Sequence, residues 1–284
     1  MHGAAFAACG LPHAYGVLEL PEAGGLDDAA SAAAEELRSR LRDPAFGGLS
    51  VTIPHKRHII PFCDALTPAA AAIGAVNTVT PTRPASTASK TLGGAPSALL
   101  GDNTDWIGIV DALGGALARV PPAAAKSGNA LVLGSGGTAR AACYALTEGW
   151  ARTAGDDGFA LFVHARDAAA AAALAADFGG AAIGDLGDAP AMDALVSTVP
   201  GAAGVTVPAA VLASGTVAVL DAAYKPARTA LLDQALAAGC PVAQGASMLV
   251  AQGAAQFERW NGRPAPVPAM RAAVFEGVED LESP

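Results

Sequence analysis

The sequence predicts an α/β protein with two domains, and three observations lead to this prediction. From residue 131 onward, short apolar runs alternate with helical segments, which is the pattern of βαβ units around a parallel sheet. A glycine-rich turn at residues 134–139 joins the first of these runs to a helix. The last segments, 247–260 and 268–281, are two helices with no strand, so we expect them to pack back on the N-terminal domain.

Composition excludes several classes of protein. The 284 residues are 52% hydrophobic and only 15% charged, so a disordered chain is excluded and a large core is expected. The net charge of −9 argues against a surface for nucleic acid or for an anionic membrane, because both need basic patches. No apolar run has the length of a membrane span, and no signal peptide is recognised. We therefore expect a cytoplasmic protein with a small-molecule substrate.

The four cysteines show no metal-ligand spacing. Cys9, Cys63, Cys143 and Cys240 are far apart and form no C-x-x-C pair. They are typical of free thiols in a reducing compartment, and no metal site is predicted.

The N-terminal part mixes short strands with helices. We expect helices at residues 4–10, 26–41, 56–63, 67–73 and 106–117, and strands at 14–20, 48–53, 75–80 and 98–100. Residues 81–97 are rich in Pro, Ser and Thr and are predicted to form an exposed hairpin excursion. We assign residues 1–104 with 246–284 to a substrate-binding and catalytic domain.

Residues 105–245 are assigned to a Rossmann-type domain that binds a dinucleotide. We expect strands at 131–133, 160–164, 194–197, 217–220 and 241–242, and helices at 138–148, 167–178 and 229–238. The first strand–turn–helix unit carries the glycine loop, whose members are Gly134, Ser135, Gly136, Gly137, Thr138 and Ala139. Glycines allow a pyrophosphate to approach the backbone N–H groups of the turn, and Ala139 stands at the third position of the usual fingerprint. The alternative is a glycine-rich turn that binds no ligand.

The end of the second strand in this unit favours NADP over NAD. An acidic residue there usually binds the ribose of NAD, whereas an arginine suits the 2′-phosphate of NADP. Here His164 and Ala165 are followed by Arg166, and the neighbouring Asp167 is compatible with NADP if it only caps the next helix. The alternative for Arg166 is a solvated surface charge.

Two polar stretches at strand ends suggest an acid–base pair. Lys56 follows the strand at 48–53, and Asp105 follows the strand at 98–100. A carboxylate can hold the lysine in place, and such a lysine can exchange a proton with an oxygen while a hydride moves to the adjacent carbon. Taken alone, Lys56 is more typical of a surface charge, and Thr104 with Asp105 is equally typical of a helix N-cap.

Six motifs together resemble the shikimate dehydrogenase family. They are Ser50-Val-Thr52-Ile-Pro54-x-Lys56, Ala75-Val-Asn77-Thr78, Asp102-Asn103-Thr104-Asp105, the glycine loop, Asp221-Ala-Ala-Tyr224-Lys-Pro226-x-x-Thr229-x-Leu-Leu232, and Gly245-Ala-Ser-Met248-Leu249-x-x-Gln252-Gly253. They occur in the family's order and at its spacings, over nearly the whole chain.

The resemblance implies an activity and a set of site residues. The activity is the reversible, NADP-dependent reduction of 3-dehydroshikimate to shikimate, in the pathway to chorismate and aromatic amino acids. Lys56 and Asp105 would be the catalytic pair. The resemblance also implies that Thr52, Asn77 and Gln252 bind substrate hydroxyls, that Tyr224 lies near the substrate, and that Gly245 and Met248 border the nicotinamide.

One departure from the family concerns the N-terminus. The family begins with a strand followed by Ser-x-Ser-Pro-x-x-His-Asn, whose serines bind the substrate carboxylate. This sequence begins at Met1-His2-Gly3 and matches only from the histidine onward. We hypothesise a start codon placed too far downstream, which an in-frame Ser-x-Ser-Pro upstream would support. A chain without those serines is expected to bind the carboxylate weakly and to show a raised KM.

Two alternative functions and the oligomeric state remain open at this point. Asp167 and the absent serines leave room for a quinate/shikimate dehydrogenase that uses NAD. A non-catalytic paralogue that binds nucleotide is a second alternative, which the acid–base residues oppose. The protein could be a monomer or a homodimer.

Overall fold

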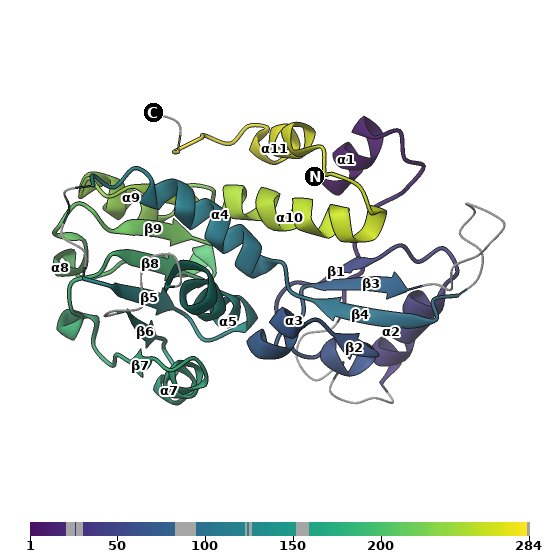
Figure 1. The fold of residues 1–284 in the computed structure, drawn as a ribbon, viewed down its shortest axis with the longest axis horizontal. Helices are drawn as coiled ribbons and strands as arrows, with labels where there is room; N and C mark the ends of the chain where they lie inside the picture. The colour runs from purple at the N-terminus through teal and green to yellow at the C-terminus, as the bar shows by residue number, and fades with distance from the viewer. Residues whose placement is uncertain are drawn as a thin grey trace.

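The computed structural model describes residues 1–20, 26, 31–82, 95–122, 124, 127–151 and 159–282. Its helices are α1 (His2–Ala8), α2 (Ala32–Arg42), α3 (Pro68–Ile73), α4 (Asp105–Leu117), α5 (Gly137–Tyr144), α7 (Ala168–Asp177), α8 (Ala209–Leu212), α9 (Ala230–Ala237), α10 (Gly245–Asn261) and α11 (Val267–Phe275). Short 3-10 turns are η1 (Ile60–Phe62), η3 (Leu186–Asp188) and η4 (Gly201–Ala203), and η2 (Ala145–Ala151) is a π-helix. The strands form two separate sheets (Figure 1).

The N-terminal sheet is small and mixed. Its strands are β1 (Leu49–Ser50), β2 (Ala65–Leu66), β3 (Thr78–Thr82) and β4 (Ala98–Asp102), in the spatial order β1-β3-β4-β2. β3 and β4 form an antiparallel pair in which Thr82 lies opposite Ala98, so the excursion between them leaves and returns at the same end. Most of that predicted excursion, residues 83–94, lies outside the described residues.

The second sheet is parallel, as was predicted for a dinucleotide-binding domain. Its strands are β5 (Asn129–Leu133), β6 (Ala160–His164), β7 (Ala181–Ala182), β8 (Ala194–Ser197), β9 (Ala218–Asp221) and β10 (Val242–Gln244). The spatial order is β10-β9-β8-β5-β6-β7, so the order of winding reverses beside β5. In sheets of this kind ligands bind at the carboxyl ends of the strands, at that reversal. The glycine loop follows β5 and therefore lies at this point.

Two long helices connect the two sheets. α4 begins at the end of β4 and runs toward the parallel sheet, and α10 lies along it (Figure 1). Gly108 allows their close approach, because a Cβ at this position would lie 2.6 Å from the carbonyl oxygen of Met248. α10 also contacts β3, while α1 and α11 pack beside it (Figure 1). The expected return of the C-terminal helices to the N-terminal part is confirmed.

Several predicted elements are shorter than expected. The predicted strand at residues 14–20 is irregular, because no described strand pairs with its backbone. The predicted helix at 56–63 contains only η1; Pro61 lacks the N–H group that a continuing helix would use. The predicted strand at 75–80 starts at Thr78, because the Val76 N–H donates instead to the Lys56 carbonyl (2.7 Å).

Two predicted helices also end differently. The helix predicted at 138–148 becomes a π-helix after Tyr144, where the Thr147 hydroxyl donates to the Cys143 carbonyl at 3.0 Å and competes with the regular ladder. The helix predicted at 268–281 ends at Phe275. Its last part turns instead to β10, where the Leu281 N–H donates to Gln244 Oε1 at 2.7 Å.

The four cysteines are free, as expected, and Cys143 and Cys240 are buried. Burial raises the pKa of the Cys143 thiol to about 12 and that of the Cys63 thiol to about 11. Over the described ranges, no helix has both the length and the apolar character that crossing a membrane requires.

Candidate functional site

A buried lysine–carboxylate pair lies between the N-terminal sheet and the glycine loop. Lys56 follows β1 in a turn and is 8% exposed, and Asp105 is the first residue of α4 and is 4% exposed. Lys56 Nζ lies 2.5 Å from Asp105 Oδ2. Each charge is largely removed from water, so each depends on the other for compensation. The predicted pairing of these two residues is therefore present, and the surface-charge interpretation of Lys56 is wrong.

The second carboxylate oxygen of Asp105 is held by Asn77. Asn77 Nδ2 donates to Asp105 Oδ1 at 2.8 Å. The Thr104 N–H donates to Asn77 Oδ1 at 2.7 Å, and because a backbone N–H can only donate, this contact fixes which end of the amide faces Asp105. Asp105 is thus fixed from two sides, by an ammonium and by an oriented amide.

Thr104 does not serve as the helix cap that its position suggests. It is the N-cap residue of α4, yet its side chain makes no capping hydrogen bond. Its hydroxyl lies instead within hydrogen-bonding distance of Asn77 and of Gln252 Oε1 (3.3 Å). Asn103 provides a contact of the capping kind, since its side-chain oxygen accepts from the Asp105 N–H at 3.0 Å. The side chains of Asn103 and Thr104 therefore take part in the polar site as well as in the start of α4.

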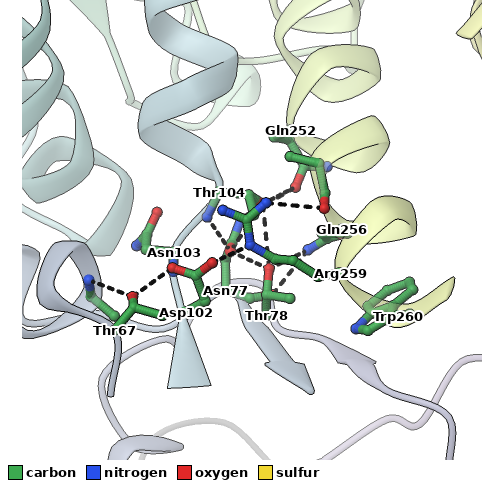
Figure 2. A network of polar contacts seen from close by, with 12 residues as sticks. Thr67, Asn77, Thr78, Asp102, Asn103, Thr104, Gln252, Gln256, Arg259 and Trp260 are labelled. Carbon is green, nitrogen blue, oxygen red and sulfur yellow. Dashed lines mark hydrogen bonds and ion pairs between the residues drawn. The ribbon is translucent and has the colours of Figure 1, made fainter. Parts of the chain in front are cut away.

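Asn77, which donates to Asp105, belongs to a larger polar network (Figure 2). Gln256 Nε2 donates to Thr78 Oγ1 at 3.0 Å, and the Thr78 hydroxyl donates to Asn77 Oδ1 at 2.6 Å. Asp102 accepts from the Thr67 hydroxyl at 2.6 Å and forms an ion pair with Arg259 of α10. These contacts bind α10 to the ends of β3 and β4, which fixes the backbone that carries the pair.

Sequence reasoning missed part of this network. Gln256 and Arg259 stand four and seven residues after Gln252, which places all three on one face of a helix. That helical spacing was the available signal. Asp102 and Asn103 were quoted only as members of a motif, without a role.

The two glycines in the middle of the loop face different surroundings. A Cβ added at Gly136 would meet open space, whereas a Cβ at Gly137 would lie 3.0 Å from the Cβ of Lys56. Gly134 has φ +115° and lies against Thr198, where a Cβ would be 2.4 Å from the hydroxyl oxygen. Only glycine is readily tolerated in that conformation.

The loop has the properties of an anion site. Gly136 is the N-cap of α5 and has no side chain to bond the first N–H groups of the helix. Within the described residues, the N–H groups of Gly136, Gly137 and Thr138 have no backbone partner. Free N–H groups beside open space, at the positive end of a helix dipole, fit a pyrophosphate.

The arginine that was predicted to select the cofactor is exposed. Arg166 follows β6 and forms no ion pair within the part of the chain that the structure describes. The Asp167 carboxylate accepts from the Ala170 N–H at 3.0 Å and so caps α7. This is the capping arrangement under which Asp167 is compatible with a 2′-phosphate.

Four other predicted site residues lie outside the polar network. Thr52 and Tyr224 are exposed, and no side-chain hydrogen bond joins them to the network among the described residues. Gly245 begins α10 against the loop after β9, where a Cβ would lie 2.5 Å from two backbone carbonyl oxygens. Met248 is buried between α10 and α4, as a core residue would be. The roles of these four residues stay predictions.

Comparison with known proteins gives consistent matches at both ends of the chain. Residues 1–79 match the shikimate dehydrogenase substrate binding domain, and residues 245–275 match the shikimate 5'-dehydrogenase C-terminal domain. A curated relative is the pentafunctional AROM polypeptide of Mycosarcoma maydis, which is 34% identical over 97% of this chain. The chain spans only 17% of the length of that relative.

Solved structures match along almost the whole length. Shikimate 5-dehydrogenase of Thermus thermophilus, solved with NADP(H) and shikimate, is 31% identical, with a TM-score of 0.73 over 97% of this chain and 92% of its own. A 5-ketofructose reductase of Gluconobacter sp. strain CHM43 is 25% identical, with a TM-score of 0.69 over 98% of this chain and 92% of its own.

Proposed function

The chain belongs to the shikimate dehydrogenase family, and we propose on this basis that it catalyses the reversible, NADP-dependent reduction of 3-dehydroshikimate to shikimate. In this assignment it is an oxidoreductase of the pathway to chorismate and the aromatic amino acids. The single observation that carries the proposal is the buried contact of 2.5 Å between Lys56 Nζ and Asp105 Oδ2 beside the glycine loop.

Lys56 is the proton donor and acceptor in this proposal. During reduction, the carbonyl carbon of the substrate gains a hydride, and the ammonium of Lys56 gives a proton to the carbonyl oxygen. In the reverse direction the neutral amine takes the proton of the alcohol. Asp105 orients the ammonium through Oδ2, and Asn77 holds the other carboxylate oxygen in place.

The surrounding polar side chains orient the substrate ring in this proposal. Asn77 and Gln252 contribute buried amide groups beside the pair, since Asn77 Nδ2 lies within hydrogen-bonding distance of both Asp105 Oδ1 and Gln252 Oε1. Thr52 and Tyr224 are assigned to the rim of the site, since both are exposed. Hydrogen bonds to several hydroxyls fix the reacting carbon, and such positioning is a large part of catalysis.

The glycine loop and Arg166 would hold the cofactor. The free N–H groups at the start of α5 suit the pyrophosphate, Arg166 suits the 2′-phosphate, and Gly245 and Met248 are assigned to the border of the nicotinamide. When bound, NADPH supplies the hydride.

The test is a comparison of substrates and cofactors in steady-state kinetics. Shikimate and quinate are each assayed with NADP⁺ and with NAD⁺, and shikimate with NADP⁺ is expected to give the highest kcat/KM. The Lys56→Ala variant should lose turnover by at least about a thousandfold while its affinity for NADP⁺ changes little. Wild-type turnover of quinate with NAD⁺ that exceeds the other rates would favour the quinate/shikimate alternative instead.

Two further outcomes distinguish the remaining alternatives. Because a structural relative is a 5-ketofructose reductase, 5-ketofructose with NADPH is included in the assay. A rate with this compound above that with 3-dehydroshikimate would refute the substrate assignment. NADP⁺ binding without turnover of any substrate would support the non-catalytic paralogue.

The assignment of substrate binding and cofactor binding to different parts of the chain is also a proposal. We assign residues 1–104 with 246–284 to substrate binding and residues 105–245 to cofactor binding. The separate N-terminal and parallel sheets support this division. Sedimentation would decide between the monomer and the homodimer.

A further inference from the structure

We propose that Thr138 is a positioning residue for Lys56, so that the loop which binds the cofactor also aims the proton donor. This inference rests on the proposed role of Lys56. Thr138 was assigned only to the cofactor loop from the sequence. Its hydroxyl oxygen accepts a hydrogen bond from Lys56 Nζ at 2.9 Å.

The hydrogen bonds of the lysine ammonium show why this contact matters. The ammonium has three N–H donors. One points to Asp105 and a second points to Thr138, and these are its two hydrogen-bond partners among the described residues. Two acceptors on different elements fix the direction of the third N–H, which is left for the substrate oxygen. With Asp105 alone, the ammonium could rotate about a single contact.

The two acceptors lie on different parts of the fold. Asp105 begins α4 at the end of β4, whereas Thr138 is a member of the glycine loop and the second residue of α5. The side-chain stem of Lys56 also packs on this loop, since a Cβ at Gly137 would lie 3.4 Å from Lys56 Cδ. Lys56 is therefore held by contacts to both parts of the chain, the one assigned to the substrate and the one assigned to the cofactor.

The hydroxyl of Thr138 can relay cofactor binding to the lysine. Its oxygen accepts from Lys56, and within the described ranges its own proton has no acceptor. A cofactor oxygen that accepted this proton would polarise the hydroxyl and strengthen its bond to the ammonium, because chains of hydrogen bonds reinforce one another. The same hydroxyl would thus contact the cofactor and orient the ammonium of Lys56.

The kinetic test compares Thr138→Val with Thr138→Ser. Valine keeps the shape but removes the hydroxyl, and serine keeps the hydroxyl. We expect kcat of the valine variant at saturating NADP⁺ to fall about tenfold, with KM for shikimate changed by less than about twofold, because the lost contact is to a charged group that acts in the chemical step. Serine should restore kcat to within about threefold of the wild type. Thr147→Val makes the same chemical change further along the same helical segment and should leave kcat unchanged.

A spectroscopic test needs neither substrate nor cofactor. The chain contains four lysines, so protein labelled with ¹⁵N-lysine gives a small set of ammonium signals, and Lys56→Arg identifies that of Lys56. Without ligands, the Lys56 signal should shift in Thr138→Val and return toward its wild-type position in Thr138→Ser. The signal of Lys225 should not move in either variant.

The outcomes separate this inference from the proposed function. A valine variant with wild-type kcat and an unshifted Lys56 signal would overturn the inference, as would a serine variant that behaves like valine. Wild-type protein without turnover would refute the proposed function, while the Lys56 signal would still decide whether Thr138 holds the ammonium.

Discussion

Alanine substitutions at the two middle glycines of the loop should have different kinetic consequences. A methyl group at Gly137 would lie 3.0 Å from Lys56 Cβ and 3.4 Å from both Ala75 Cβ and Lys56 Cδ. Ordinary contacts between such atoms start near 3.5 Å, so the lysine stem must move by about 0.5 Å. A misplacement of 1 Å can cost about a hundredfold in rate, so we expect kcat of Gly137→Ala to fall about tenfold.

The same substitution should leave the fold and the cofactor affinity nearly intact. Gly137 lies inside α5 without a positive φ, where alanine is an acceptable residue. The melting temperature should therefore change by no more than about 3 °C. KM for NADP⁺ should change by less than about twofold, because the added methyl faces Lys56.

Gly136→Ala is the matched control. Its methyl group would enter the open space in front of the loop, where the pyrophosphate is proposed to lie. We expect KM for NADP⁺ to rise at least about tenfold, with a smaller effect on kcat at saturating cofactor. The two variants are compared by steady-state kinetics with shikimate and by thermal unfolding. If Gly137→Ala raised KM for NADP⁺ and left kcat unchanged, the steric reasoning would be refuted.

Two predictions concern stability. Burial raises the pKa of the Asp221 carboxyl, which accepts from the Thr229 hydroxyl and the Ala223 N–H. The unfolded state therefore releases this proton more readily than the folded state. As a result, the free energy of unfolding falls as pH rises above about 4. The melting temperature of Asp221→Asn should therefore rise relative to that of the wild type as the pH is raised from 4 to 8. A difference in melting temperature that became smaller with pH would contradict this direction. Gly245→Ala would place a methyl group 2.5 Å from the carbonyl oxygens of Ala222 and Ala223, and urea unfolding should show a loss of about 1–3 kcal/mol. An unchanged urea midpoint would contradict this estimate, because it would show that the loop at Ala222 and Ala223 shifts to accommodate the methyl group at little cost.

The parallel sheet was predictable because its signals are local. β6 and β8 were predicted with their observed bounds, since each is an apolar run between turn residues. Helix caps are also local signals. The side chains of Asp167 and Thr229 accept backbone N–H groups at the starts of α7 and α9, and Asp and Thr are favoured at this position. The N-terminal part was less predictable. There the N–H group of Val76, which was expected in a strand, donates to the turn at Lys56, and no local pattern encodes that partner.

The sequence by itself determined which chemical groups are present and near which strand ends they stand. Lys56, Asp105 and the glycine loop could each be named from residue type and local order. Only the tertiary structure decided that Thr104 bonds to the network instead of capping its helix, and that Gly137 and Thr138 contact the lysine. The physical reason is that residue type and local spacing fix a backbone conformation, whereas hydrogen bonds between side chains 82 residues apart depend on how two sheets and two helices pack.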